Sequence, residues 1–263
     1  MKLNIYQVDS FTEKPFAGNP AGVCVMEQRL DERLMQQIAM EMNLSETAFA
    51  VREGEGFRLR WFTPTVEVEL CGHATLATAH ILWEIGIVKS SGLAVFNTAS
   101  GILYASRKGN LIELDFPAKL EEKADAPPGL LEALHVDATY IGKSAFDYLV
   151  LVESEDTIKN MEPDYSLLKK VQARGVMVTS RSSSPNYDFI SRFFAPACGV
   201  NEDPVTGSSH CTLGPFWRKH INKNVFTAYQ ASARGGIVHV RLSGNRVYLG
   251  GHAITVMEGT FIV

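Results

Sequence analysis

The sequence predicts an α+β protein made of two similar halves, each with short strands around one buried helix. Most segments alternate apolar and polar residues, as the first one does over residues 3–8. Residues 72–86 are apolar on nearly every side, which predicts a helix enclosed by other structure. One short motif occurs twice, at residues 60–64 and 192–196, and this repetition indicates an internal duplication.

The first half begins with alternating strands and one amphipathic helix. A helix is expected over residues 30–42, where Leu34, Ile38 and Met42 form one stripe. The helix at 72–86 follows it. Strands are expected at residues 3–8, 21–26, 45–51, 57–62, 93–98, 102–107 and 111–116.

The second half repeats this style after a candidate linker. Residues 117–129 contain three prolines and several charges, which is typical of a connection. Helices are expected over 165–174 and 208–220. Strands are expected at residues 148–152, 176–179, 187–194, 238–242, 247–249 and 255–256.

The halves are therefore placed at residues 1–117 and 118–263, and the last strand, about 252–263, is able to join the first half. The active site is expected in a cleft between them.

Composition excludes several classes of function. The net charge of −4 over 263 residues leaves no basic surface for nucleic acid. No apolar run reaches the roughly 20 residues of a membrane span. The four cysteines form no CxxC pair, so we expect reduced thiols and a cytoplasmic protein. Dinucleotide, P-loop and metal-ligand spacings all fail, so neither a cofactor nor a metal is expected.

The repeated motif leads each time into a glycine that begins a helix. Arg60-Trp61-Phe62-Thr63-Pro64 precedes Gly72, and Arg192-Phe193-Phe194-Ala195-Pro196 precedes Gly207. Helix N-termini offer free N–H groups and a positive dipole end, which suit a carboxylate or a developing enolate. The alternative is that both glycines only turn the chain.

Four polar side chains near these glycines are candidates for chemistry. A buried Glu46 would be a general base near neutral pH, whereas an exposed one would be an ordinary surface residue. His73 would polarise a substrate oxygen or serve the structure alone. Asp203 is a candidate proton donor or a helix cap, and Ser208 a first-turn hydroxyl. Ser208 and His210 do not form a hydrolase signature, because Gly-x-Ser-x-Gly is absent.

In this order, the motifs resemble those of the PhzF family, named for an isomerase of phenazine biosynthesis. Single motifs are weak evidence, but the ordered set is highly specific. The matching segments lie at residues 7–12, 18–23, 43–49, 63–64, 69–75, 191–196 and 202–208, with a weaker match at 230–236.

The resemblance implies the diaminopimelate-epimerase-like fold, in which two pseudo-symmetric halves each curve a mostly antiparallel sheet around a central helix. It implies that Glu46 moves a proton as general base and acid, and that His73 and Asp203 are catalytic. It places Gly72, Gly207 and Ser208 at the substrate. It also implies an enzyme without a cofactor, acting on a small, unsaturated, carboxylate-bearing molecule, and often a homodimer.

Two alternatives remain open. Epimerases and racemases of the same fold use one cysteine from each half; Cys71 stands before Gly72, but Thr206 stands before Gly207 and cannot supply a thiolate. The other alternative is a catalytically silent protein that only binds a small molecule. The substrate itself is not indicated by any motif.

Overall fold

Strands outnumber helices in the computed structural model, which describes residues 1–89 and 91–263. The chain divides into two compact units. Unit 1 consists of residues 1–116 and 248–263, and unit 2 of residues 117–247. Strand β17 (Arg246–Gly251) carries the chain from unit 2 back into unit 1. No helix in the described ranges is long and apolar enough to cross a membrane.

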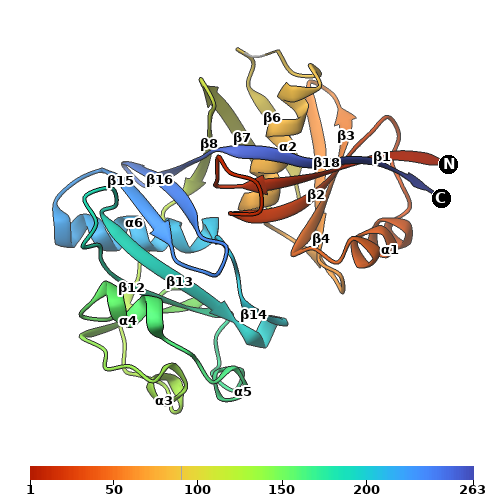
Figure 1. Cartoon of the computed structure of the whole chain (residues 1–263). Helices are drawn as coiled ribbons and strands as arrows, with labels where there is room; N and C mark the ends of the chain where they lie inside the picture. Colours follow the sequence, from red (N-terminus) through yellow and green to blue (C-terminus); the bar gives the residue numbers. More distant parts are fainter. Residues whose placement is uncertain (90) are drawn as a thin grey trace. The chain divides into compact units, whose positions relative to one another are not determined.

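Unit 1 surrounds helix α2 (Gly72–Glu84) with strands. Ten of the 13 residues of α2 are buried, as its all-round apolar sequence predicted, and it packs against β1, β2, β3 and β18 (Figure 1). The strands of unit 1 are β1 (Lys2–Ser10), β2 (Asn19–Met26), β3 (Glu46–Glu53), β4 (Gly56–Phe62), β5 (Glu67–Val68), β6 (Ala94–Thr98), β7 (Gly101–Lys108), β8 (Leu111–Pro117) and β18 (Ala253–Ile262).

Strand β1 lies between two antiparallel partners, β2 and the C-terminal strand β18. Next to them, β2 runs parallel to β3, because α1 (Glu32–Met42) carries the chain between them. Helix α1 begins at Glu32 rather than at the expected residue 30, since the Asp31 side chain accepts a hydrogen bond from the Arg33 N–H.

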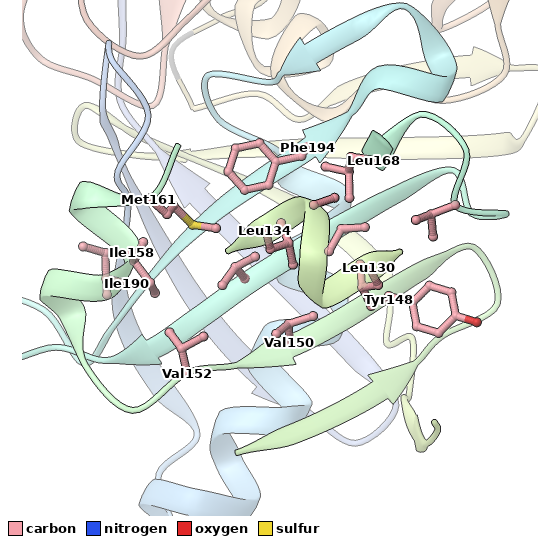
Figure 2. Close-up of a cluster of buried hydrophobic side chains, with 14 residues drawn as sticks. Leu130, Leu134, Tyr148, Val150, Val152, Ile158, Met161, Leu168, Ile190 and Phe194 are labelled. Atoms are coloured by element: carbon pink, nitrogen blue, oxygen red, sulfur yellow. The ribbon is translucent and has the colours of Figure 1, made fainter. Parts of the chain in front are cut away.

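Unit 2 surrounds α6 (Gly207–Ile221) in the same way, and ten of its residues are buried. A second core lies on the other face of its sheet, where short helices cover strand residues such as Val150 and Ile190 (Figure 2). The further elements of unit 2 are β9 (Glu122–Lys123), α3 (Leu130–Leu134), β10 (Tyr140–Lys143), β11 (Asp147–Leu151), α4 (Glu155–Asn160), α5 (Tyr165–Leu168), β12 (Gly175–Arg181), β13 (Phe189–Ala195), the 3₁₀ turn Pro196–Cys198, β14 (Val200–Glu202), β15 (Val225–Gln230) and β16 (Gly236–Ser243).

Each unit has the same succession of pairings. In unit 1, β2 runs parallel to β3, β3 antiparallel to β4, and β4 parallel to β6. In unit 2, β11, β12, β13 and β15 pair in the same senses. The enclosed helix follows the third strand of the series in both units, after a short strand. The α+β class and the two pseudo-symmetric halves are therefore confirmed.

The repeated motif makes the same contacts in both units. Arg60 donates two hydrogen bonds to Glu67 on β5, and Arg192 donates two to Glu202 on β14. Each guanidinium also lies over the phenylalanine two residues later, at 5.1 Å from the ring centre of Phe62 and 5.0 Å from that of Phe194. The motif thus joins strand to strand and directs the loop toward the enclosed helix.

Several expected elements differ from the structure. The helix expected over 165–174 ends at Leu168, because Asp164 caps only one turn and β12 begins soon after it. Residues 117–129 are an ordered part of unit 2 rather than a simple linker, since β9 pairs with β10. The sequence did not predict α3, α4, β5, β9, β10, β14 or β15, which have two to six residues each.

Candidate active site

The first residues of β3 and of α2 meet in unit 1. Glu46 begins β3 beside Ala21 of β2, and its side chain is 19% exposed. His73 is the second residue of α2, and its side chain is 6% exposed. The Glu46 Oε2 and His73 Nε2 atoms are 3.2 Å apart. This pair places a carboxylate that water can reach against a buried imidazole.

Three neighbours hold His73 in place. The Ser10 hydroxyl donates to the His73 carbonyl at 2.9 Å. Asn19 Nδ2 lies 3.2 Å from the imidazole Nδ1, and Cys71 Sγ lies 3.5 Å from the same nitrogen. Because an amide NH₂ only donates, Nδ1 accepts, and the proton of the neutral ring belongs on Nε2, facing Glu46.

Burial keeps this imidazole uncharged. Desolvation lowers the pKa of His73 from its ordinary value to about 3. At neutral pH, His73 is therefore a neutral N–H donor. The Nε2 atom makes no aligned hydrogen bond with the described residues. Such contacts are often loose in ligand-free sites and tighten when substrate binds.

Glu46, Cys71 and His73 also form a cluster of potential metal ligands, which no sequence spacing had indicated. One ligand atom of each lies within 4.8 Å of the others. The two ring nitrogens of His73 face different partners, however: Nε2 faces Glu46 and Nδ1 faces Cys71. A single metal ion binds only one nitrogen of an imidazole, and here the carboxylate and the thiol lie at different nitrogens. The cluster fits a hydrogen-bonded chain better than a metal centre.

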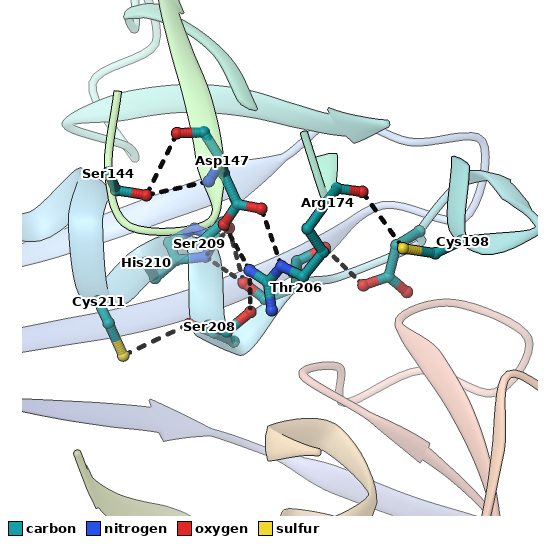
Figure 3. Close-up of polar contacts among 11 residues, drawn as sticks. Ser144, Asp147, Arg174, Cys198, Thr206, Ser208, Ser209, His210 and Cys211 are labelled. Carbon is teal, nitrogen blue, oxygen red and sulfur yellow. Dashed lines mark hydrogen bonds and ion pairs between the residues drawn. The ribbon is translucent and has the colours of Figure 1, made fainter. Parts of the chain in front are cut away.

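In unit 2, a charged pair lies at the N-terminus of α6. Arg174 donates to both carboxylate oxygens of the buried Asp147 and, at 3.2 Å, to the hydroxyl of Ser208 (Figure 3). Gly207 begins the helix, and Ser208 is its second residue. A guanidinium and first-turn N–H groups therefore gather beside Ser208, an arrangement suited to an anionic group.

Asp203 lies in the loop before α6, three residues ahead of the N-cap residue Thr206. Its Oδ2 accepts a hydrogen bond from the Thr206 hydroxyl at 2.5 Å, and Thr206 is the N-cap residue. Gln230 on β15 binds the same loop, accepting from the Thr206 N–H and donating to the Asp203 carbonyl. The loop is thus held by side chains and not by α6 alone.

The candidate residues named from the sequence therefore form two groups, one in each unit. Unit 1 brings together Glu46, Gly72 and His73, while Asp203, Gly207 and Ser208 lie at the N-terminus of α6 in unit 2.

Two neighbours of these candidates were missed, Asn19 and Arg174. Asn19 lies in residues 18–23, one of the segments that resemble the family, but no role was expected for it. Nothing in the sequence pairs Arg174 with Asp147, because 27 residues separate them.

The strand registers show which residues of the two units correspond. Phe62 pairs with Thr47, and Phe194 pairs with Val176, so Glu46 corresponds to Gly175. A Cβ atom at Gly175 would lie 2.3 Å from the Phe193 ring, so no side chain fits there without rearrangement. The N-cap residues Cys71 and Thr206 correspond as well. A carboxylate at this strand position is therefore present in unit 1 and not in unit 2.

Comparison with known proteins shows the family of the chain. The family model described as "Phenazine biosynthesis-like protein" matches residues 8–259. A protein of Halalkalibacterium halodurans named as an uncharacterized isomerase is 51% identical over the full length of both chains. The crystal structure of a PhzF-family phenazine biosynthesis protein of Enterococcus faecalis matches at a TM-score of 0.96, with 42% identity and complete coverage of both chains.

A more distant structure shares the fold alone. A hydroxyproline epimerase of Agrobacterium vitis matches at a TM-score of 0.66 with 10% identity, over 98% of this chain and 92% of that one. Its similarity supports the epimerase-like arrangement of the strands and helices and says nothing about substrate. On the family model and the close relatives, the chain belongs to the phenazine biosynthesis-like (PhzC-PhzF) isomerase family.

Proposed function

We propose that this protein is a cofactor-independent isomerase that moves a proton between two carbons of a small, unsaturated carboxylic acid. The observation that carries the proposal is the Glu46 carboxylate, held 3.2 Å from a buried, neutral His73 at the beginning of α2. The names of the close relatives support the reaction class. The substrate class is the one that the family resemblance implies, and the donors at the N-terminus of α6 support its carboxylate.

In the proposed reaction, Glu46 takes a proton from a carbon activated by a neighbouring carboxylate or double bond. The electron pair of that C–H bond moves into the unsaturated system, and negative charge develops on substrate oxygen. The His73 N–H and the first N–H groups of α2 stabilise this charge. Glu46, now protonated, returns the proton to another carbon. The double bond shifts, and nothing is oxidised or reduced.

The residues at α6 have proposed binding roles. Ser208 and the N–H of Gly207 offer donors for a substrate carboxylate. Asp203 is proposed to orient the substrate or to donate a proton, and its bond from Thr206 keeps its carboxyl oriented. We expect Arg174 to add positive charge beside Ser208, which again favours an anionic substrate.

A two-cysteine epimerase is the second candidate, because Cys71 lies at the N-cap of α2. Such a mechanism needs an acid and a base on opposite faces of one carbon. The residue of unit 2 that corresponds to Cys71 is Thr206, and the one that corresponds to Glu46 is Gly175. A single carboxylate that moves one proton between carbons fits these residues better.

The reaction class is tested by incubating the protein in deuterated water with a panel of small unsaturated carboxylic acids and recording proton NMR spectra. We expect deuterium to enter one acid at the carbons that exchange the proton, with the double bond displaced. A chelator or an added nicotinamide cofactor is expected to leave the rate unchanged. Inversion at a single carbon without displacement of a double bond would favour the epimerase instead.

A further inference from the structure

Two paired residues at one end of β1 and β2 hold His73 from two sides. Ser10 and Asn19 are opposite one another in the β1–β2 register, and both are fully buried. Ser10 donates to the backbone carbonyl of His73, whereas Asn19 reaches the ring nitrogen Nδ1. The backbone and the ring of one histidine are therefore held by neighbouring positions of the same sheet.

The preceding glycine allows this approach. Gly18 has a φ of +64°, and a Cβ atom there would lie 2.1 Å from the Ser10 carbonyl oxygen. Only glycine lets the chain turn so closely against β1 before Asn19 enters β2. The position of the Asn19 amide is thus determined by a tight turn as well as by the strand.

The contact between Asn19 and Nδ1 favours one tautomer of the His73 imidazole. A neutral imidazole carries one proton, and the nitrogen without it has a lone pair. If Nδ1 carried the proton, the lone pair of Nε2 would face the Glu46 carboxylate at 3.2 Å, and two acceptors would meet. An amide NH₂ directed at Nδ1 opposes that tautomer, and a Cys71 thiol directed at the same nitrogen acts in the same sense, though more weakly.

We infer that Asn19 is a positioning residue: by donating to Nδ1, it holds His73 as the Nε2–H tautomer and keeps that N–H on the side of Glu46. The effect on turnover rests on the proposed function of Glu46. The tautomer of His73 does not depend on that function, so the tautomer assignment and the proposed function can be refuted independently. Cys71 then serves as a thiol donor to His73 and not as the thiolate base of a two-cysteine reaction.

The tautomer is measured directly by long-range ¹H–¹⁵N NMR of histidine-labelled protein, with the His73 signals assigned by their loss in His73→Asn. We expect the Nε2–H form in the wild type between pH 5 and 8. In Asn19→Asp, the new carboxylate accepts from Nδ1, and the Nδ1–H form is expected. Ser10→Ala is the matched control: it also removes a buried hydrogen bond to His73, but one to the backbone, so the Nε2–H form should persist.

An Nδ1–H or protonated His73 in the wild type would overturn the inference, as would an unchanged tautomer in folded Asn19→Asp. The wild-type measurement decides the question even if the variants fail to fold. Once a substrate is known, Asn19→Leu should lower kcat about tenfold or more, with a much smaller change in KM. If Glu46→Gln keeps full activity, the proposed function fails, and the NMR result still decides the role of Asn19.

Discussion

At the scale of single residues, burial keeps two imidazoles uncharged. His73 and His210 are the second and fourth residues of the two enclosed helices, and burial lowers their pKa values to about 3 and about 4. His210 contacts the Thr206 carbonyl through Nδ1 at 2.8 Å and stacks on Phe189. Both imidazoles therefore act as neutral hydrogen-bonding groups, and only His73 has a carboxylate beside it.

His210 should make the stability depend on pH. Its folded pKa of about 4 lies below the ordinary 6.5, so between these values the unfolded chain binds a proton that the folded chain does not. The contribution of neutral His210 to the free energy of unfolding is complete above pH 6.5. It is lost as the pH falls toward 4, by up to about 1.4 kcal/mol per pH unit. In His210→Gln, the free energy of unfolding, measured with urea at pH 7 and pH 5, should change less than in the wild type. An equal change in both proteins would contradict this assignment.

The four cysteines should differ sharply in reactivity. Cys198 is exposed, whereas Cys24, Cys71 and Cys211 are buried. Burial raises the pKa of Cys24, and that of Cys211 to about 12, which leaves little thiolate. A thiol reagent at pH 7.5 should modify one cysteine rapidly in the native protein and four after denaturation, and mass spectrometry should locate the first at Cys198. Rapid modification of Cys71 would favour the two-cysteine epimerase.

At the scale of elements, the tight turn before β2 positions Asn19 beside His73. The turn before β2 is the most constrained, since Gly18 combines a positive φ with a clash against Ser10. Gly54, in the turn between β3 and β4, has a similar φ of +59°, but a side chain there would meet open space. The two glycines therefore form a natural matched pair.

Alanine should be tolerated at one of these glycines and not at the other. Gly54→Ala is expected to cost about 1–2 kcal/mol of unfolding free energy, the price of a left-handed conformation. Gly18→Ala carries the same strain and adds the clash, so its loss should be clearly larger. Urea denaturation of both variants measures the difference. Equal losses would mean that the β1–β2 turn relaxes around the new methyl group.

At the scale of the whole molecule, the two units differ in how the chain builds them. Unit 2 is one continuous segment, but unit 1 needs residues 248–263, whose strand β18 pairs along the whole of β1. A strand that loses such a partner exposes a row of unpaired backbone groups. The C-terminus is thus structural in the unit that contains Glu46.

Fragments should show this difference. Residues 117–247 alone are expected to fold, with a cooperative urea transition and dispersed NMR signals. Residues 1–117 alone should remain unfolded or aggregate, and a covalently joined 248–263 segment should restore folding. Native-like spectra from residues 1–117 without that segment would contradict the account.

Much of this arrangement can be predicted from the sequence, because it is local. The duplicated Arg-aromatic-Phe-x-Pro motif and the all-round apolar segment at 72–86 predict two halves and their enclosed helices. Glu46 and His73 could be named from motifs, but their 3.2 Å contact depends on the fold of the 26 residues between them. The Asn19–His73 and Arg174–Asp147 contacts join residues far apart in the sequence and leave no periodic signal.

Short elements such as β10 and α4 were not predicted from the sequence for a different reason. They are too brief for a pattern to develop, and unit 2 stabilises them by packing.

The central claim is that the Glu46 carboxylate moves the proton, and strand β3 supplies the control. Glu46 begins this strand and Glu53 ends it, where Glu53 pairs with Arg29 at the surface. The decisive measurement is the rate of deuterium entry from solvent into the reactive acid, with Glu46→Gln and Glu53→Gln compared at equal stability. We expect Glu53→Gln to stay within about twofold of the wild type and Glu46→Gln to lose about 10²-fold or more. Exchange at the wild-type rate in folded Glu46→Gln would contradict the account.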